Sequence, residues 1–224
     1  MNKIPNQIAM DGTAASGKTT VGKIIAEKLN YLFFDTGIMY RVAAYGANRK
    51  LDDISDEKKV SELIESMDIS LENDKVRGVT NVLLDGQNIT DQLHLPEVDK
   101  IVSTVAAYPA VRKALTSQQR RIGLQGRVVM VGRDIGTVVM PDAEMKIYLE
   151  ASPETRAKRR YLENLSKHIE SETYEMILAD IIKRDKADQE RTVAPLRPAD
   201  DAVIIHTDDY TAEEIADQIL ALMD

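Results

Sequence analysis

Residues Gly12 to Thr19 constrain the fold of this chain more than any other segment. They read Gly-Thr-Ala-Ala-Ser-Gly-Lys-Thr and match the pattern G-x-x-x-x-G-K-[ST] at every fixed position. An apolar run, Gln7–Met10, precedes them, and a stretch with the apolar spacing of a helix follows up to Leu29. A glycine-rich turn placed between a strand and a helix is typical of a phosphate-binding loop.

The residue types in this loop suit a nucleoside triphosphate. Glycine at positions 12 and 17 allows a tight turn that brings backbone N–H groups onto phosphate, and the helix that begins near Lys18 adds the positive end of its dipole. Lys18 can reach the β and γ phosphates, and the Thr19 hydroxyl can ligate Mg²⁺. We therefore predict that a nucleoside triphosphate and Mg²⁺ are held at Gly12, Thr13, Ala14, Ala15, Ser16, Gly17, Lys18, Thr19 and Thr20.

Apolar runs of strand length alternate with helical stretches along most of the chain. This alternation predicts an α/β fold, with a five-stranded parallel sheet flanked by helices and ligands at the carboxyl ends of its strands. Thr211 and Glu214 have the spacing of a capping box at the start of the last helix. The five predicted strands, each expected to be buried on both faces, are Gln7–Met10, Leu32–Asp35, Val128–Gly132, Met145–Ala151 and Ala202–Thr207.

One segment departs from this alternation of strands and helices, and its pattern predicts a small antiparallel β insert. Strand-like pieces Ile69–Glu72 and Val79–Leu84 are followed by Asp85-Gly86, a strong two-residue hairpin signal, and then by Gln87–Thr90. A helix should flank this insert, because apolar residues recur at Val60, Leu63, Ile64 and Met67.

Composition excludes several classes of protein. The 224 residues include no cysteine, which excludes a disulfide scaffold and a thiolate metal site. The N-terminal residues contain no apolar run of signal-peptide length, and no run approaches a membrane span, so we expect a cytoplasmic protein without a membrane partner. A net charge of −8 is opposite in sign to that of a typical nucleic-acid-binding protein.

Other proteins with such a loop fit this sequence less well. A GTPase needs [NT]-K-x-D after a late strand, whereas Asp185-Lys186-Ala187-Asp188 has the wrong first residue and lies in a helical pattern. An ATP-driven motor usually has an apolar strand that ends in consecutive acids, and none of the five strands does so. A small-molecule kinase remains.

Arginines after several predicted strands favour phosphoryl transfer to a phosphate-bearing acceptor. Two like charges 4 Å apart repel by about 4 kcal/mol at an effective dielectric near 20. The planar guanidinium, which binds phosphate oxygens in pairs, is suited to relieve this repulsion. A phosphomonoester is already ionised near neutral pH, so no catalytic base is required. The candidate arginines are Arg41, Arg133, Arg156, Arg159, Arg160, Arg184 and Arg191; for the cluster from Arg156 to Arg160, a solvated helix face is an equal alternative.

Four further motifs follow predicted strands or lie in the later helical segments. They are Asp35-Thr36-Gly37-x-x-Tyr40-Arg41, Gly132-Arg133-Asp134-x-Gly136-Thr137, Arg184-Asp185 and Arg191-Thr192-Val193-Ala194-Pro195-Leu196. Together with the phosphate-binding loop, they resemble the bacterial cytidylate kinases, nucleoside monophosphate kinases with a P-loop. The likeness spans nearly the whole chain, although Thr13 replaces a proline that is common in the family.

The resemblance implies a role for each matching residue in ATP-dependent phosphorylation of CMP and dCMP. Arg41 and Arg133 would hold the acceptor phosphate beside Tyr40, and Arg184 and Asp188 would lie near the ribose. The cytosine would face Ser103, Arg112 and Asp134, with Thr36 and Arg191 nearby. Lys18, Arg133, Arg156, Arg159 and Arg160 would be catalytic, the last three on a mobile lid.

The resemblance also implies how the chain is divided. The core would comprise residues 1–36, 100–152 and 192–224, with a monophosphate-binding region at about 37–99 and a lid at about 153–191. We expect a monomer. A kinase of another small acceptor, such as a different nucleotide or shikimate, and a non-catalytic ATP-binding regulator remain as alternatives.

Overall fold

The structure, a computed structural model, describes residues 4–74, 79–166 and 172–223. The chain divides into two compact units. The first combines Met1–Phe34 with Gly126–Asp224, and the second is Asp35–Gln125. The phosphate-binding loop belongs to the first unit, and the β insert belongs to the second.

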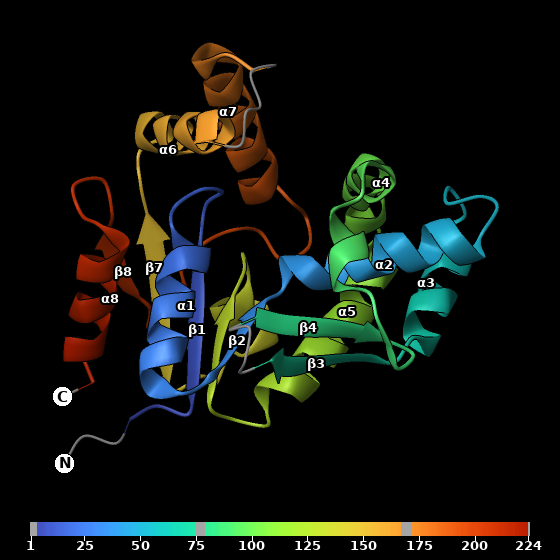
Figure 1. The fold of residues 1–224 in the computed structure, drawn as a ribbon, viewed down its shortest axis with the longest axis horizontal. Helices are drawn as coiled ribbons and strands as arrows, with labels where there is room; N and C mark the ends of the chain where they lie inside the picture. The colour runs from blue at the N-terminus through green and yellow to red at the C-terminus, as the bar shows by residue number, and fades with distance from the viewer. Residues whose placement is uncertain (1–3, 75–78, 167–171, 224) are drawn as a thin grey trace. The chain divides into compact units, whose positions relative to one another are not determined.

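A five-stranded parallel sheet forms the centre of the first unit (Figure 1). The strand order is β2-β6-β1-β7-β8, so β1 lies in the middle and the loop that follows it leaves from the centre of the sheet. This confirms the predicted fold class. The strands are β1 (Gln7–Gly12), β2 (Leu32–Asp35), β6 (Val128–Val131), β7 (Met145–Glu150) and β8 (Val203–His206).

Helices α1 (Lys18–Leu29) and α8 (Ala212–Ala221) pack beside one another on one face of this sheet. Ile8 and Met10 of β1 are fully buried in the same apolar cluster as Val21 and Ile25 of α1. The capping box predicted for the last helix is present at the start of α8. The unit also contains η2 (Ile135–Val139), α6 (Pro153–Ser166) and α7 (Tyr174–Gln189).

The expectation that every strand is buried on both faces is wrong for β8. Val203 and Ile204 are 41% and 49% exposed. The reason is topological: β8 is the edge strand, with only β7 beside it in the sheet, so it has less cover than the central strands.

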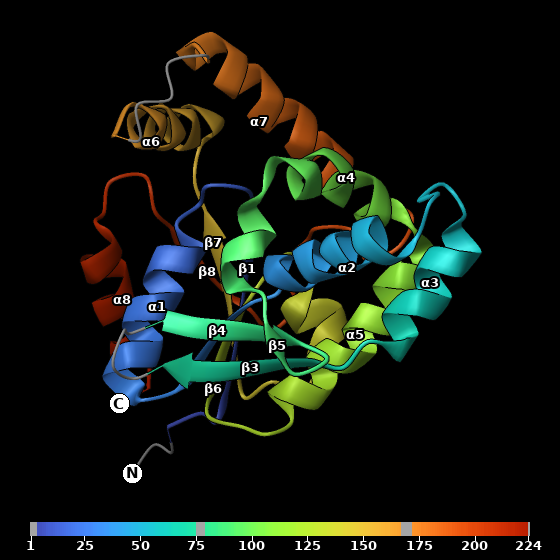
Figure 2. The ribbon, with the colours of Figure 1, turned by 45° about the vertical axis from the view of Figure 1, so that its right-hand side comes forward.

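The second unit contains the β insert. Its three strands, β3 (Ile69–Asp74), β4 (Val79–Leu84) and β5 (Gln87–Asn88), form a separate antiparallel sheet (Figure 2). Asp85 and Gly86 have φ values of 50° and 79°, as a tight hairpin turn requires, so the predicted hairpin is confirmed.

Helices make up the rest of this unit. Pro96 and Pro109 each occupy the first turn of a helix, where a missing N–H costs nothing. The expected helix beside the insert is α3. The elements are α2 (Gly37–Lys50), α3 (Glu57–Ser66), η1 (Thr90–His94), α4 (Pro96–Ala107) and α5 (Pro109–Gly123).

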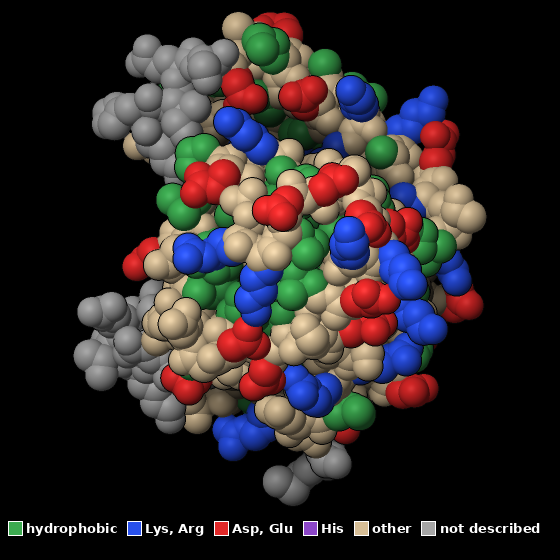
Figure 3. All heavy atoms as spheres, turned by 90° about the vertical axis from the view of Figure 1, so that its right-hand side faces the viewer, with side chains coloured by type: hydrophobic (Ala, Val, Ile, Leu, Met, Phe, Trp, Pro, Cys, Tyr) green, Lys and Arg blue, Asp and Glu red, His purple; other side chains and the backbone are tan. Residues whose placement is uncertain are grey.

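Charges of both signs are interspersed on the face shown in Figure 3. Several exposed ion pairs of the second unit have this mixed character, including Lys58–Glu62 and Arg121–Asp68. Such a surface lacks the single-signed stripe that usually follows a nucleic acid backbone. Among the described residues, no helix is long and apolar enough to cross a membrane.

Candidate active site

The loop after β1 has the backbone of a phosphate cradle. Gly12 has a φ of 147°, and a Cβ atom there would lie 2.2 Å from the backbone oxygen of Leu149, so only glycine fits. Ala15 and Gly17 also have positive φ values, 58° and 96°. Gly17 is the N-cap of α1, so the loop leads directly into the positive end of that helix. This arrangement can bind phosphate as the sequence predicts.

The Lys18 side chain lies back over this loop. It is 6% exposed, and its Nζ donates to the carbonyl oxygen of Thr13 at 2.5 Å and to Ser16 Oγ at 3.2 Å. The buried Thr13 hydroxyl has no hydrogen-bond partner within the described part of the chain. The ammonium group is therefore held at the loop by oxygens that phosphate oxygens can replace.

Asp11, directly before the loop, is a buried acid that sequence reasoning missed. Its Oδ1 accepts from the N–H of Ile135 at 2.8 Å, and its Oδ2 accepts from the N–H of Gly136 at 2.7 Å. Burial raises the pKa of Asp11 to about 6, with a smaller contribution from the charge of Asp134, although the two amide bonds act in the opposite direction. The sequence feature that could have identified Asp11 is an acidic residue at the end of an otherwise apolar strand.

Arg133 and Asp134 follow β6, as predicted. The Nε of Arg133 donates to Asp188 Oδ2 at 3.1 Å, and Asp134 is 7% exposed. Arg191 also contacts Asp188, with 3.7 Å between Nη2 and Oδ1. Partial shielding from water by neighbouring groups lowers the pKa of Arg184, the positive charge of Arg133 lowers it further, and Asp188 partly compensates.

Four predicted residues of the first unit are thus brought together: Arg133, Arg184, Asp188 and Arg191. The Arg184 side chain is exposed, and a guanidinium whose charge is opposed by a second arginine is better stabilised once an anion arrives. The cluster is suited to binding a phosphate.

Arg156 is buried in the interior of the first unit. It is 2% exposed, and its Nη1 and Nη2 donate to the Asp185 carboxylate at 3.1 and 2.5 Å. Nη1 also donates to the carbonyl oxygen of Ala14 in the loop at 3.2 Å, and Nε donates to that of Ala151. Its guanidinium therefore links the phosphate loop to α7.

Arg159 and Arg160 lie in different surroundings. Arg159 donates to both the hydroxyl and the carbonyl oxygen of Thr207, and the Thr207 hydroxyl donates to the carbonyl oxygen of Ser16. Arg160 has a 55% exposed side chain and pairs with Glu163 at 3.2 Å. The predicted basic cluster is thus split: Arg156 is buried, whereas Lys158 and Arg160 are exposed, as on a solvated helix face.

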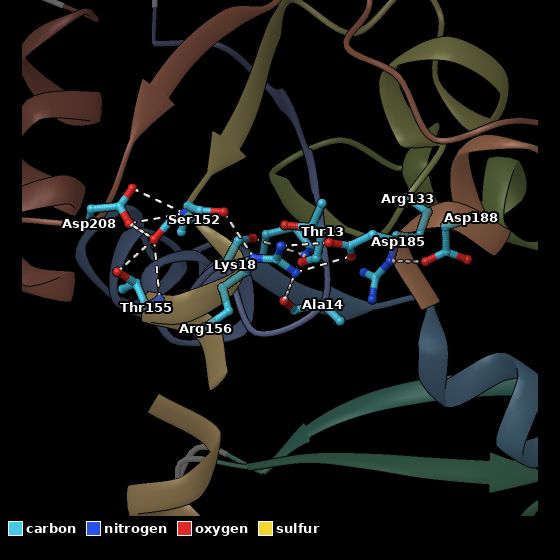
Figure 4. Close-up of polar contacts among 12 residues, drawn as sticks. Thr13, Ala14, Lys18, Arg133, Ser152, Thr155, Arg156, Asp185, Asp188 and Asp208 are labelled. Carbon is cyan, nitrogen blue, oxygen red and sulfur yellow. Dashed lines mark hydrogen bonds and ion pairs between the residues drawn. The ribbon is translucent and has the colours of Figure 1, made fainter. Parts of the chain in front are cut away.

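A second network missed by sequence reasoning lies where β7 and β8 end. The Asp208 carboxylate accepts from the Ser152 hydroxyl and from its N–H at 3.0 Å. Hydrogen bonds from the Ser152 and Thr155 hydroxyls lower the pKa of Asp208 to about 2. Figure 4 shows Asp208 and Ser152 on one side of Lys18 and Arg156, with Arg133 and Asp188 on the other.

The remaining predicted residues belong to the second unit. The guanidinium of Arg112 lies over the Tyr40 ring, 5.4 Å from its centre, and Arg41 donates to the carbonyl oxygen of Leu93 at 2.9 Å. Thr36 is buried at the start of α2, whereas Ser103 is exposed on α4. The structure therefore brings Tyr40 and Arg112 together.

The residues around the loop are compatible with Mg²⁺. Across residues 4–74, 79–166 and 172–223, no group of three or more His, Cys, Asp or Glu side chains could hold a metal ion. Mg²⁺ does not need one, because it commonly binds through few protein oxygens, with phosphates and water completing its shell. The exposed Thr19 hydroxyl, in the first turn of α1, is the predicted protein ligand.

Comparison with known proteins identifies the family. The family model for cytidylate kinase matches residues 8–224. A cytidylate kinase from Bacillus subtilis is 46% identical over 213 residues, covering 95% of this chain and 94% of the relative. One from Bacillus cereus is 42% identical over 216 residues, covering 96% and 95%. The chain belongs to the cytidylate kinase family.

Membership of the cytidylate kinase family makes the chain a nucleoside monophosphate kinase, with ATP and Mg²⁺ as its cofactors. Among solved structures, a shikimate kinase from Bacteroides thetaiotaomicron is similar, with a TM-score of 0.53 over 96% of this chain and 97% of that one. Its sequence is only 15% identical, so this similarity shows the fold alone. The cytidylate kinase relatives do not favour the alternative of a different acceptor.

Proposed function

We propose that this chain transfers the γ-phosphoryl group of ATP to CMP and dCMP, giving ADP and CDP or dCDP. The observation that carries this proposal is the connection between two anion sites within the first unit. Arg156 joins the phosphate loop at Ala14 to Asp185 of α7, and Asp188, one turn along the same helix, holds Arg133.

The chemistry of this arrangement is positioning and charge stabilisation. Lys18 and the loop amides hold the donor phosphates, with Mg²⁺ at Thr19. Arg133 neutralises the acceptor phosphate, which is already ionised and needs no general base. Arginines that hold two mutually repelling anions lower the barrier only if they are fixed in place, and Asp188 supplies this constraint on Arg133.

Asp134 is proposed to read the cytosine. A buried carboxylate accepts a hydrogen bond from the N4 amino group of cytosine and disfavours uracil, which presents O4 at the same position. Arg191 is proposed to contribute to recognition of the cytosine. Asp188 and Arg184 are proposed to lie near the ribose.

In the second unit, Arg41 and Tyr40 are proposed to bind the acceptor phosphate. Arg112, Ser103 and Thr36 are proposed to contact the base. The contact between Arg112 and the Tyr40 ring supports a shared role, because it orients both side chains within the unit.

These roles assign a function to each region of the chain. Residues 37–99 would form the monophosphate-binding region and residues 153–191 a lid, of which Arg156, Arg159 and Arg160 are part. We propose that the enzyme acts as a monomer in the cytoplasm on small nucleotides and not on nucleic acid. The net charge of −8 and the mixed surface charge support the last point.

An acceptor screen tests the proposal. ADP release with Mg²⁺-ATP is measured with CMP, dCMP, UMP, AMP and shikimate at equal concentrations. We expect the highest kcat/KM with CMP or dCMP. A preference for UMP, AMP or shikimate would overturn the assignment of the acceptor. Tight ATP binding without acceptor-dependent turnover would instead favour an ATP-binding regulator.

A further inference from the structure

Asp11 is a charged side chain in the interior of the first unit to which the proposed chemistry gives no role. Its two carboxylate oxygens each accept one backbone N–H, from Ile135 at 2.8 Å and from Gly136 at 2.7 Å. The donors are more than 120 residues away in sequence, on the turn that follows Arg133 and Asp134. Asp11 thus joins the strand that carries the phosphate loop to the turn that carries the acceptor-binding pair.

The turn passes close to Asp11 at position 136. A Cβ atom there would lie 3.4 Å from Asp11 Oδ2 and 3.3 Å from Lys146 Cδ, so a methyl group would just touch both side chains and a larger group would collide with them. The turn continues as η2, where the carbonyl oxygen of Asp134 accepts from the N–H groups of Val138 and Val139. The backbone of Asp134 is therefore fixed from one side by Asp11 and from the other by η2.

The turn would have room to shift without this contact. A polar cleft of about 170 Å³ lies beside it, lined by Gly136, Thr137, Lys146, Arg197, Ala199, Asp200 and Asp201. The buried hydroxyl of Thr137 has no hydrogen-bond partner among the residues that the structure describes. The Thr137 side chain therefore adds no hydrogen bond of its own that would hold the turn on the cleft side.

The charged groups near Asp11 act on its carboxylate in opposite directions. Asp134 repels it and Lys18 attracts it. Tyr148 of the neighbouring strand pairs with it in register, and the Lys146 ammonium is already paired with Asp201 at 2.8 Å. Among the residues that the structure describes, the two amides are the groups that donate hydrogen bonds to Asp11. Hydrogen bonds to an ionised acceptor are about twice as strong as neutral ones.

We propose that Asp11 is a positioning residue for acceptor recognition, holding the Arg133–Asp134 turn against the strand that carries the phosphate loop. This inference rests on the proposed function. Asp11 contacts neither substrate. It acts by fixing the backbone from which Arg133 reaches the phosphate and Asp134 reaches the base, so its loss would weaken acceptor recognition more than donor binding.

Asp11→Asn tests this directly. The amide has the same shape but only one acceptor oxygen, so one of the two N–H groups must face an NH₂ group. We expect the KM for CMP to rise roughly tenfold and the preference for CMP over UMP to fall by a similar factor, as for loss of one charged hydrogen bond. The KM for ATP should change less than about twofold. In NMR spectra, the amide protons of Ile135 and Gly136 should move upfield.

Gly136→Val provides a second route to the same result and keeps the carboxylate. Because a Cβ atom at position 136 already lies 3.4 Å from Asp11 Oδ2, the branched methyl groups should push the turn away from Asp11 and reproduce the acceptor-specific effect. Combining it with Asp11→Asn should add little, because both variants break the same contact. Ile219→Val, on the core-facing side of α8, is the stability control and should leave the acceptor KM unchanged.

The outcomes separate this inference from the proposed function. If the unaltered enzyme does not phosphorylate CMP, the proposed function fails. If it does, but Asp11→Asn retains its KM for CMP and its preference over UMP, the positioning role is refuted. Equal losses of CMP and ATP binding would also refute it, as would a rise in the KM for CMP of the same size in Ile219→Val. If Asp11→Asn does not fold, Gly136→Val decides by the same criteria.

Discussion

Arg156 and Asp185 form a two-pronged ion pair in the interior of the first unit, with N–O distances of 3.1 and 2.5 Å. Arg156 is 2% exposed and Asp185 13%. Because the same guanidinium also donates to the carbonyl oxygen of Ala14, the pair connects α7 to the phosphate loop. A side chain predicted to belong to a mobile lid is therefore a structural link at the base of that segment.

Arg156→Ala should destabilise the protein by about 3–5 kcal/mol, because it leaves the Asp185 carboxylate buried without its partner. Denaturant unfolding measures this change, and kcat should fall as well because the loop loses support. Arg160→Ala is the matched control: its exposed pair with Glu163 should contribute less than about 1 kcal/mol. Similar losses in both variants would contradict the structural role of Arg156.

Lys18→Met should lower kcat by about a thousandfold while leaving the fold intact, because the charge that stabilises the transferred phosphoryl group is lost. Stopped assays of ADP release and circular dichroism measure the two effects. Lys23→Met, which removes a lysine further along α1, should retain near-normal turnover. A Lys18 variant with wild-type turnover would refute the role of the loop.

Asp134→Ala should raise the KM for CMP roughly tenfold to a hundredfold, as expected for loss of a hydrogen bond to a charged group. The discrimination between CMP and UMP should narrow, since the carboxylate that disfavours uracil is gone. Initial rates with both acceptors give this ratio. Unchanged selectivity would show that another residue reads the base.

Asp11 should make a measurable contribution to the pH dependence of the free energy of unfolding. Its pKa is raised from 3.8 to about 6 in the folded protein, so the folded state binds more protons than the unfolded state between these values. The contribution of Asp11 to stability is therefore present below pH 4 and is lost as pH rises through 6, by on the order of 3 kcal/mol. The measurement is the free energy of unfolding against pH for wild type and Asp11→Asn.

The difference between the two unfolding curves isolates the contribution of Asp11. Carboxylates with lowered pKa values change the free energy of unfolding with pH in the opposite sense, but they do so equally in both proteins and cancel in the difference. Asp208, with a pKa of about 2, is one of them. A wild-type-minus-variant difference that is flat between pH 4 and 6 would show that Asp11 is not perturbed by burial.

Local patterns were sufficient to predict much of the fold. The strand before Gly12, the hairpin at Asp85-Gly86 and the capping box at Thr211 each depend on residues that are neighbours in sequence. The sequence also placed Arg133 and Asp134 correctly after β6, because the end of an apolar run marks the end of a strand.

The interactions that were missed join residues far apart in the chain. Asp11 meets Gly136, and Ser152 meets Asp208, across 125 and 56 residues. Spacing carries no information about such pairs. The burial of Arg156 was also hidden, because a run of basic residues reads as a solvated helix face when the partner acid is 29 residues away. The exposure of β8 depended on strand order, which alternation alone does not give.

The spacing of Asp185 and Asp188 along α7 matters for anyone who grafts this segment between related enzymes. One acid engages an arginine that touches the donor loop, and the other engages the arginine after β6. A chimera that takes α7 from another protein, but keeps the rest of this chain, must preserve both acids in register with both arginines. Inserting or deleting a single residue between them would rotate one acid away by about 100°, since a helix has about 3.6 residues per turn. Binding of the donor and binding of the acceptor would then be impaired together, even though no substrate-contacting side chain had been replaced.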